Sequence, residues 1–325
     1  MVIFLAAWDS KNVLITGATG LLGGHLAAKL ASEGANAVAI VRDDVPKCFF
    51  YLEDIDKQVS VVRGSLEDYF LVERTMNEYE IEAVFHLGAQ TIVGTANRSP
   101  LSTFEANIKG TWNVLEAARS SKFIKAVVAA STDKVYGEST KLPYTEVDPL
   151  SANHPYDVSK ACADMLCSSY FKTYGLPVGV TRCGNIFGSG DLNFNRIIPG
   201  TIRSLLKKER PEIRSDGKMV RDYVYVEDIV DANILLAEKL LSGKEKGEAF
   251  NFSYGEPQSV LEVVGKVSKA MDSKLEPRIL NQVQNEIPKQ YLSNEKAKTR
   301  LNWKAKWNFD AGLKKTISWY EKYLK

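Results

Sequence analysis

Cysteine and histidine are the scarce residues of this 325-residue chain, which has four of the first and three of the second. The cysteines show no Cys-x-x-Cys spacing and stand beside no cluster of histidines, so the sequence suggests neither a zinc site nor a disulfide framework. We therefore expect no bound metal. The residues concerned are Cys48, Cys162, Cys167 and Cys183, with His25, His86 and His154.

An excess of charge of one sign is also lacking. The formal net charge is +2, and lysines and arginines are interspersed with aspartates and glutamates. This balance does not provide the basic surface that nucleic acid or anionic lipid requires, so neither is an expected partner. An anionic ligand must be met by a local site.

No hydrophobic run is long enough to cross a membrane. Residues Val2–Trp8 are apolar, but no basic segment precedes them and the apolar length is too short, so they fit neither a signal peptide nor a span. We expect a cytoplasmic protein with no membrane partner.

What the chain does contain is an alternation of short apolar runs and longer amphipathic stretches from about residue 11 to 182. Strands that alternate with helices predict βαβ units and a parallel sheet, and continuous apolar runs suit strands covered on both faces. The predicted strands are Asn12–Thr16, Ala37–Val41, Val59–Val62, Ala83–Leu87, Ala126–Ala130 and Val178–Arg182.

The pattern changes after Gly184. A helix over Glu227–Leu240 and a strand over Ala249–Phe252 indicate a late return to the sheet. The prediction is an α/β fold, a doubly wound parallel Rossmann-type sheet with a smaller C-terminal substrate-binding lobe. Residues 8–185 plus 219–252 would form the sheet domain, and residues 186–218 plus 253–325 the lobe.

A glycine-rich turn follows the first predicted strand. Gly17, Gly20 and Gly23 lie between that strand and an amphipathic helix. A pyrophosphate needs backbone N–H donors without Cβ atoms in the way, and a helix N-terminus adds further donors and a favourable dipole. The order strand, turn and helix therefore favours a dinucleotide site over an ordinary turn.

The end of the second strand bears on which dinucleotide is bound. An acidic residue there bonds the ribose of NAD, whereas an arginine can accept the 2′-phosphate of NADP. Arg42 stands at this position with Asp43 beside it. NADP is slightly favoured, and NAD with Asp43 on the ribose is the alternative.

Tyr156 and Lys160 form the single Tyr-x-x-x-Lys of the chain, at the start of a predicted helix. At this spacing they share a helix face, and a nearby ammonium should lower the tyrosine pKa and make it a usable base. Thr132, Asp133 and Lys134 follow a strand one βα unit earlier, so both segments can meet at the carboxyl edge of the sheet.

Taken together, these segments resemble the extended short-chain dehydrogenase/reductases, specifically the nucleotide-sugar epimerases and dehydratases. The resemblance covers nearly the whole chain. It rests on Thr16–Gly23, His86–Ala89, Asn107–Thr111, Ser131–Gly137, Tyr156–Lys160, Gly184–Gly188 and Arg221–Asp228.

The resemblance implies roles for individual residues. Tyr156 would take the proton of the sugar 4-hydroxyl, Lys160 would bond the nicotinamide ribose, and Thr132 would bond the same 4-hydroxyl. The implied substrate-binding residues are Gln90, Thr132, Asn185, Arg196 and Arg221. The implied cofactor-binding residues are Gly17, Thr19, Gly20, Leu21, Leu22, Arg42, Ser65, Leu66, Leu87, Gly88, Ala89, Asn107, Tyr156 and Lys160.

The pair Asp133-Lys134 distinguishes between reactions within this family. Simple 4-epimerases usually have small residues here, whereas a 4,6-dehydratase needs a base for the C5 proton and an acid for the departing 6-hydroxyl. Thymidine-linked glucose 4,6-dehydratases usually have Asp-Glu, and Asp-Lys resembles the cytidine-linked enzymes. Asp133 would be the acid and Lys134 the base. Ser65, where relatives usually have aspartate, and Gly88, where alanine is common, are departures.

The sequence therefore predicts a nucleotide-sugar 4,6-dehydratase that uses NADP or NAD and acts on a nucleoside-diphosphate hexose. A 4-epimerase is the main alternative, which holds if Asp133 and Lys134 form only a cap or a surface ion pair. A reductase and a non-catalytic dinucleotide-binding protein are further alternatives. By resemblance, the helices over Leu101–Ser120 and Tyr156–Tyr174 would pair two subunits in a homodimer.

Overall fold

Seven parallel strands form the central sheet of the computed structural model, which describes residues 7–282 and 287–324. Their spatial order is β11-β6-β5-β4-β1-β2-β3, so the order reverses between β1 and β4. Ligands bind in open α/β sheets beside such a reversal, at the carboxyl ends of the strands. The strands are β1 Asn12–Thr16, β2 Asn36–Val41, β3 Ser60–Arg63, β4 Ala83–His86, β5 Ala126–Thr132, β6 Val178–Cys183 and β11 Ala249–Phe252.

These strands confirm the predicted fold class and lie within one or two residues of the predicted ranges. The late return to the sheet is also confirmed, because β11 pairs in parallel with β6. The prediction that Val2–Trp8 is neither signal nor span concerns mainly residues 2–6, which lie outside the described residues.

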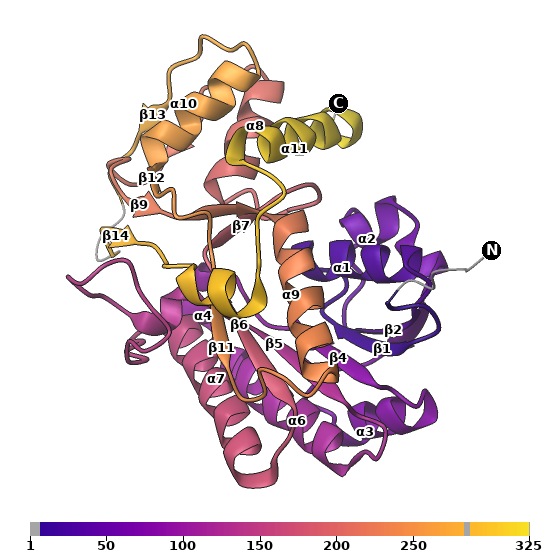
Figure 1. Ribbon diagram of the computed structural model, residues 1–325. Helices are drawn as coiled ribbons and strands as arrows, with labels where there is room; N and C mark the ends of the chain where they lie inside the picture. The colour runs from indigo at the N-terminus through magenta and orange to yellow at the C-terminus, as the bar shows by residue number, and fades with distance from the viewer. Residues whose placement is uncertain (1–6, 283–286, 325) are drawn as a thin grey trace.

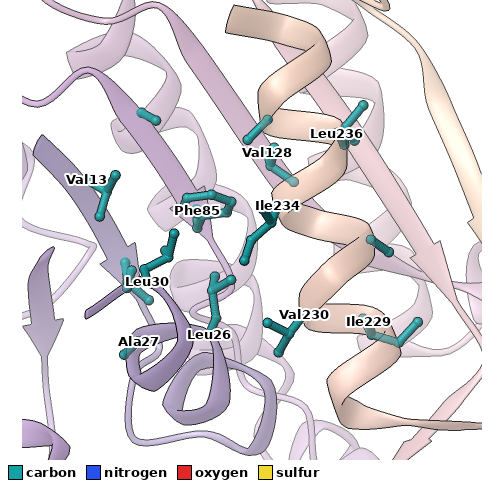
Figure 2. Packing of buried hydrophobic residues seen from close by; sticks show 14 of the residues in the cluster. Val13, Leu26, Ala27, Leu30, Phe85, Val128, Ile229, Val230, Ile234 and Leu236 are labelled. Atoms are coloured by element: carbon teal, nitrogen blue, oxygen red, sulfur yellow. The ribbon is translucent and has the colours of Figure 1, made fainter. Parts of the chain in front are cut away.

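Helices cover both faces of the sheet. Successive residues of β1 point to opposite faces, so Val13 and Ile15 pack with α1 and α9 whereas Leu14 packs with α3, α6 and α7. Figure 2 shows the first of these layers, with Leu26 and Leu30 of α1 facing the α9 side chains across Phe85. The helices of the sheet domain are α1 Leu21–Ser32, α2 Phe49–Leu52, α3 Tyr69–Glu78, α4 Val93–Arg98, α5 Pro100–Phe104, α6 Gly110–Ser120, α7 Pro155–Tyr174 and α9 Val226–Leu241.

One predicted helix is interrupted. The sequence predicts continuous helix over Leu101–Ser120, but a π-helical turn, η2 Glu105–Lys109, separates α5 from α6. Such turns often mark functional positions, and this one carries Asn107.

Most of the remaining elements form a second body at the top of Figure 1, whereas η4 packs against α9 and β11 of the sheet domain. The core of the second body joins α8, α10 and α11 with β7 and β10, which pair with each other in parallel. A separate three-stranded sheet has the order β12-β9-β14. The bounds are β7 Asn185–Phe187, α8 Ile197–Leu206, β8 Glu212–Ile213, β9 Val220–Arg221, β10 Tyr223–Tyr225, β12 Gln258–Ser259, α10 Val260–Ala270, β13 Arg278–Ile279, β14 Lys289–Gln290, η4 Ala297–Leu301 and α11 Phe309–Tyr323.

The two bodies are joined at several points. Leu21 and Leu22 at the start of α1 pack against the core of the second body. Conversely, Ala297, Leu301 and Trp303 are buried in the core of the sheet domain. Each body therefore contributes side chains to the core of the other.

Within residues 7–282 and 287–324, every helix is too short or too polar to span a bilayer.

Candidate active site

The turn between β1 and α1 is built around close backbone contacts. Gly17 has φ of +76°, which favours glycine, and a Cβ there would lie 2.8 Å from Gly88 Cα. A Cβ on Gly23 would lie 2.1 Å from the Gly17 carbonyl oxygen, so only glycine fits. Gly20 precedes the first helical residue and is exposed, and Thr19 is half-buried beside it. The predicted phosphate loop thus has the open backbone and helix N-terminus that a pyrophosphate requires.

The loop after β4 lies against this turn. Thr16 Oγ1 accepts hydrogen bonds from the backbone N–H groups of Leu87 (3.0 Å) and Gly88 (2.9 Å). A Cβ on Gly88 would lie 2.8 Å from Leu66 Cδ1, so the glycine leaves room for the Leu66 side chain. The predicted cofactor residues Leu66, Leu87, Gly88 and half-buried Ala89 are therefore close to the glycine turn.

His86 is buried beneath these loops, and sequence reasoning assigned it no role. Its Nδ1 lies 3.0 Å from Thr16 Oγ1 and its Nε2 lies 2.9 Å from Thr111 Oγ1. Thr111 donates its own proton to the Asn107 carbonyl (2.6 Å), so His86 Nε2 is the donor and Nδ1 the acceptor. Burial lowers the His86 pKa to about 3, which keeps the ring neutral. This chain fixes β1 and β4 relative to α6.

Asn107 extends the same network toward the tyrosine. Its amide exchanges two hydrogen bonds with the Gln90 backbone, accepting from N–H (2.7 Å) and donating to C=O (3.0 Å). It also donates to Ser159 Oγ (2.8 Å), which donates to the Tyr156 carbonyl (2.7 Å). The Gln90 side chain accepts from the Ile92 N–H (2.9 Å). Sequence reasoning missed Ser159. Its position between Tyr156 and Lys160 was the signal that could have identified this serine.

The predicted contacts at the adenosine end lie at the surface of the molecule. Arg42 is exposed, and its Nε donates to Asp43 Oδ2 (2.7 Å). Ser65 is half-buried and donates to the Glu67 carboxylate. Arg42 and Asp43 thus stand together at the end of β2, and the ion pair leaves both on the same surface.

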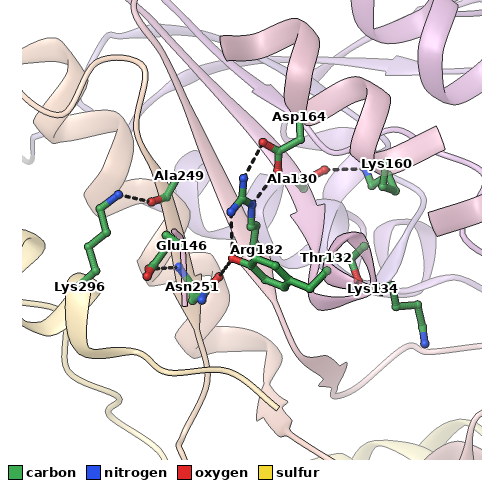
Figure 3. A network of polar contacts seen from close by, with 11 residues as sticks. Ala130, Thr132, Lys134, Glu146, Lys160, Asp164, Arg182, Ala249, Asn251 and Lys296 are labelled. Atoms are coloured by element: carbon green, nitrogen blue, oxygen red, sulfur yellow. Dashed lines mark hydrogen bonds and ion pairs between the residues drawn. The ribbon is translucent and has the colours of Figure 1, made fainter. Parts of the chain in front are cut away.

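Tyr156 and Lys160 are both buried in the first turns of α7, but their electrostatics differ from the prediction. Burial raises the pKa of the Tyr156 phenol, and Asp157 and Asp133 add to the rise. The Arg196 guanidinium is the cation that opposes it. Lys160 instead donates to the Ala130 carbonyl at 2.5 Å (Figure 3). Burial lowers its pKa to about 8.

The predicted lowering of the Tyr156 pKa by Lys160 is therefore wrong for this structure. The four-residue spacing puts both side chains on one face, as predicted. In the structure the Lys160 amine donates to the Ala130 carbonyl, and burial is the largest effect on the phenol pKa.

The Thr132-Asp133-Lys134 segment leaves β5 through a short 3₁₀ turn, η3 Asp133–Tyr136. Thr132 donates to Asp133 Oδ1 (3.0 Å), and burial raises the pKa of the Asp133 carboxyl. Asp133 is 2% exposed, which does not fit a surface ion pair. Lys134 is half-buried, and its Nζ donates to Gln290 Oε1 (3.4 Å).

Two buried residues at this point were missed by sequence reasoning. Gln290 on β14 contacts the turn from the second body, and its position far along the chain gave no signal. Asp157 follows Tyr156, and its Oδ1 has no hydrogen-bond partner among the described residues. Burial raises the Asp157 pKa, while Lys134 and His154 oppose the rise.

Three of the predicted substrate residues come from the second body, whereas Gln90 and Thr132 lie in the sheet domain. Arg221 on β9 is buried and donates from Nη1 to the Val220 carbonyl (2.8 Å). Asn185 begins β7, and its N–H donates to the Asp222 carbonyl (2.8 Å). Arg196 caps α8 and donates to Asp191 Oδ2 (3.0 Å).

Asp222, next to Arg221, is fully buried and accepts a hydrogen bond from the Leu292 N–H (2.6 Å). Burial raises its pKa to about 7. Its carboxylate thus ties β9 to the segment that carries Gln290.

Comparison with known proteins agrees with this geometry. The family profile described as the NAD dependent epimerase/dehydratase family matches residues 13–252. The chain belongs to this family. The relatives of this chain include sugar-nucleotide dehydratases and epimerases.

Three relatives illustrate the range of reactions found among similar proteins. A trifunctional UDP-glucose 4,6-dehydratase/UDP-4-keto-6-deoxy-D-glucose 3,5-epimerase/UDP-4-keto-L-rhamnose-reductase of Arabidopsis thaliana is 30% identical over 97% of this chain. The chain spans about half of that relative, 48% of its length. CDP-glucose 4,6-dehydratase of Salmonella typhimurium is 26% identical over 98% of this chain and 92% of its own. The crystal structure of UDP-glucose 4-epimerase from Thermotoga maritima has a TM-score of 0.89 at 29% identity, covering 97% of this chain and all of that one.

Proposed function

We propose that the protein is a nucleotide-sugar 4,6-dehydratase, which converts a nucleoside-diphosphate hexose to the 4-keto-6-deoxy sugar with loss of one water. The observation that carries the proposal is the Thr132–Lys134 turn. It sets a buried carboxyl and an amine at the same edge of the sheet as Tyr156. The dehydratases among the relatives support it.

The cofactor of the proposed reaction is a nicotinamide dinucleotide. The turn at Gly17 and Gly23 is packed so tightly that no Cβ fits, and it leads into a helix N-terminus, which suits a pyrophosphate. When bound, such a dinucleotide would supply the hydride chemistry of the reaction. The position of Arg42 at the end of β2 supports NADP, because an arginine there can accept the 2′-phosphate, and NAD with Asp43 on the ribose is the alternative.

The chain's own residues would move the protons. Tyr156 would take the proton of the 4-hydroxyl, and Arg196 favours its phenolate. Asp133 would protonate the departing 6-hydroxyl, and its raised pKa suits a carboxyl that must hold a proton. Lys134 would remove the C5 proton. Thr132 would bond the 4-hydroxyl.

The substrate diphosphate would lie against the second body. Arg221 and Asn185 would bind the phosphates, with Arg196 and Gln90 nearer the sugar. The division into a dinucleotide domain of residues 8–185 plus 219–252 and a sugar-nucleotide lobe of residues 186–218 plus 253–325 belongs to this proposal. Within 219–252, the short strands β9 and β10 pack with the second body.

We also propose a homodimer through the helices α5 to α7. Leu101, Trp112 and Met165 on these helices are 72%, 43% and 62% exposed, respectively. Large exposed apolar side chains on neighbouring helices suit a subunit contact. The cytoplasmic location expected from the sequence stays a prediction.

The test is incubation of the protein with each common nucleoside-diphosphate hexose and with NAD or NADP, followed by mass spectrometry of the sugar nucleotide. The proposal predicts loss of the mass of one water, with no net consumption of cofactor. An unchanged mass with inverted C4 would instead establish a 4-epimerase, and consumption of added NADPH a reductase.

A 4-epimerase is the second candidate because the Thermotoga maritima epimerase superposes on nearly the whole chain. Lys134→Met separates the two reactions. It should abolish loss of water in a dehydratase, because no base remains for C5, and should leave C4 inversion in an epimerase little changed.

A further inference from the structure

Gln290 holds both members of the Asp133-Lys134 pair. Its Oε1 accepts from Lys134 Nζ (3.4 Å), and its Nε2 donates to the Asp133 carbonyl (3.3 Å). The side chain is 0% exposed. An amide has one acceptor and one donor end, so a single side chain satisfies both groups in a defined orientation.

Gln290 reaches the turn from the second body. It lies on β14, in parallel register with β9, so that Gln290 stands opposite Arg221. The Asp222 carboxylate binds the Leu292 N–H two residues later and fixes this strand. The side chain that touches the turn is therefore attached to the strand that carries the expected phosphate ligand.

The elimination step makes a strict demand on Lys134. The C5–H bond breaks and its proton passes to the lysine nitrogen, while the electron pair forms the C5=C6 bond. The C6–O6 bond breaks, and the Asp133 proton completes the departing water. A long, flexible lysine side chain needs a partner that limits its rotamers, because misplacement by about 1 Å can cost about 100-fold in rate.

We propose that Gln290 is a positioning residue for this step. Gln290 holds the Lys134 amine next to the Asp133 backbone and connects both to the strand that carries Arg221. The inference rests on the proposed dehydratase function. It adds a residue to the site from a part of the chain that the sequence motifs do not cover.

Among the described residues, charged groups from three elements lie around the Asp133-Lys134 pair. Asp133 lies next to Lys134 on the same turn, and Asp157 faces it from the first turn of α7. Arg221 and Asp222 act on Asp133 from β9 and its C-terminal end. Gln290 is the neutral partner among them, so replacing it by glutamate adds one negative charge at the amine.

The first experiment follows exchange of the C5 hydrogen in deuterated water by mass spectrometry, at saturating nucleotide sugar. Gln290→Leu keeps the side-chain size but removes both hydrogen bonds. We expect C5 exchange and loss of water to fall by about 100-fold with little change in KM. A fall of the same size in kcat/KM that comes only from a higher KM, with kcat unchanged, would overturn the proposal.

The second experiment measures how fast an amine-reactive ester labels Lys134 at different pH values, and it needs no turnover. In Gln290→Glu the added carboxylate favours the ammonium form, so the half-point of labelling should rise by about one pH unit or more. An unchanged half-point would contradict the contact. If the wild-type protein removes no water, the proposed function fails, and this labelling still decides whether Gln290 holds Lys134.

Asn294→Leu is the matched control. Asn294 is a buried amide of the same segment, and it donates to the Ser253 carbonyl (2.7 Å). This variant should lower the melting temperature without moving the labelling half-point. A shift in the control equal to that of Gln290→Glu would show a general loosening of the segment and overturn the specific role.

Discussion

Arg42 is the side chain on which the choice of dinucleotide depends. If it binds a 2′-phosphate, Arg42→Ala removes a charged hydrogen bond and should weaken NADP by about 10-fold or more, while NAD binding changes little. Titration calorimetry with both dinucleotides measures this. An equal loss of affinity for NADP and NAD, or a loss for NAD alone, would contradict the 2′-phosphate contact. It would support the alternative, in which Asp43 binds the ribose of NAD.

The residue types of the site were predictable from the sequence, whereas their electrostatics were not. Tyr156, Lys160 and Thr132 lie at one edge of the sheet, as the motifs predict. Burial raises the phenol pKa, and Arg196 from the second body opposes the rise. Helical spacing gives no information on such contacts, and the same is true of Gln290.

At the scale of elements, the turn between β1 and α1 is the tightest contact of the predicted cofactor site. Gly23→Ala would place a Cβ 2.1 Å from a backbone oxygen, so the turn must shift. We expect a loss of roughly 1–3 kcal/mol in unfolding free energy and weaker dinucleotide binding. Gly265→Ala is the control, because a Cβ there meets nothing within 4 Å and should stabilise α10 by up to about 1 kcal/mol. Denaturant unfolding of both variants checks the contrast.

The helix α7 is fixed to the sheet by a buried ion pair. Arg182 on β6 donates two hydrogen bonds to Asp164 (2.8 and 2.9 Å), as drawn in Figure 3. It donates a third to the Tyr136 hydroxyl (2.9 Å). Arg182→Met leaves the carboxylate buried and unpaired, so we expect a loss of about 3–5 kcal/mol.

Denaturant unfolding measures this loss, and the double variant Arg182→Met with Asp164→Leu should regain part of it. Lys57→Met, which removes an exposed ion pair with Asp54, should leave stability unchanged. An Arg182→Met variant as stable as the wild type would contradict the anchoring role of the pair.

Strong periodicity made the elements of the sheet domain predictable, because apolar runs and glycine turns report local geometry. The π turn at Glu105–Lys109 was not predictable from periodicity, and it carries Asn107, which bonds the Gln90 backbone. The short strands β9 and β14 were not predictable either. They are two residues long and exist only because distant segments pair.

At the scale of the whole molecule, the junction between the two bodies should make stability depend on pH. Burial raises the Asp222 pKa to about 7, so between about pH 4 and 7 the folded protein holds a proton that the unfolded chain has lost. Stability from this group is therefore fully present below pH 4 and falls as pH rises toward 7. The total change is at most roughly 4 kcal/mol, at about 1.4 kcal/mol for each pH unit.

Asp222→Asn keeps an acceptor for the Leu292 N–H and removes the titration. Its stability relative to the wild type should improve steadily from pH 4 to 7 in thermal melts. A difference that is constant with pH would contradict the buried, proton-holding carboxyl.

The most direct test of the central claim uses a nucleoside-diphosphate hexose that carries deuterium at C4. The account predicts a product that is lighter by one water and carries the deuterium at C6, because hydride leaves C4 and returns to C6 of the same sugar. Deuterium that remains at C4 in a sugar of unchanged composition would contradict it and establish an epimerase instead.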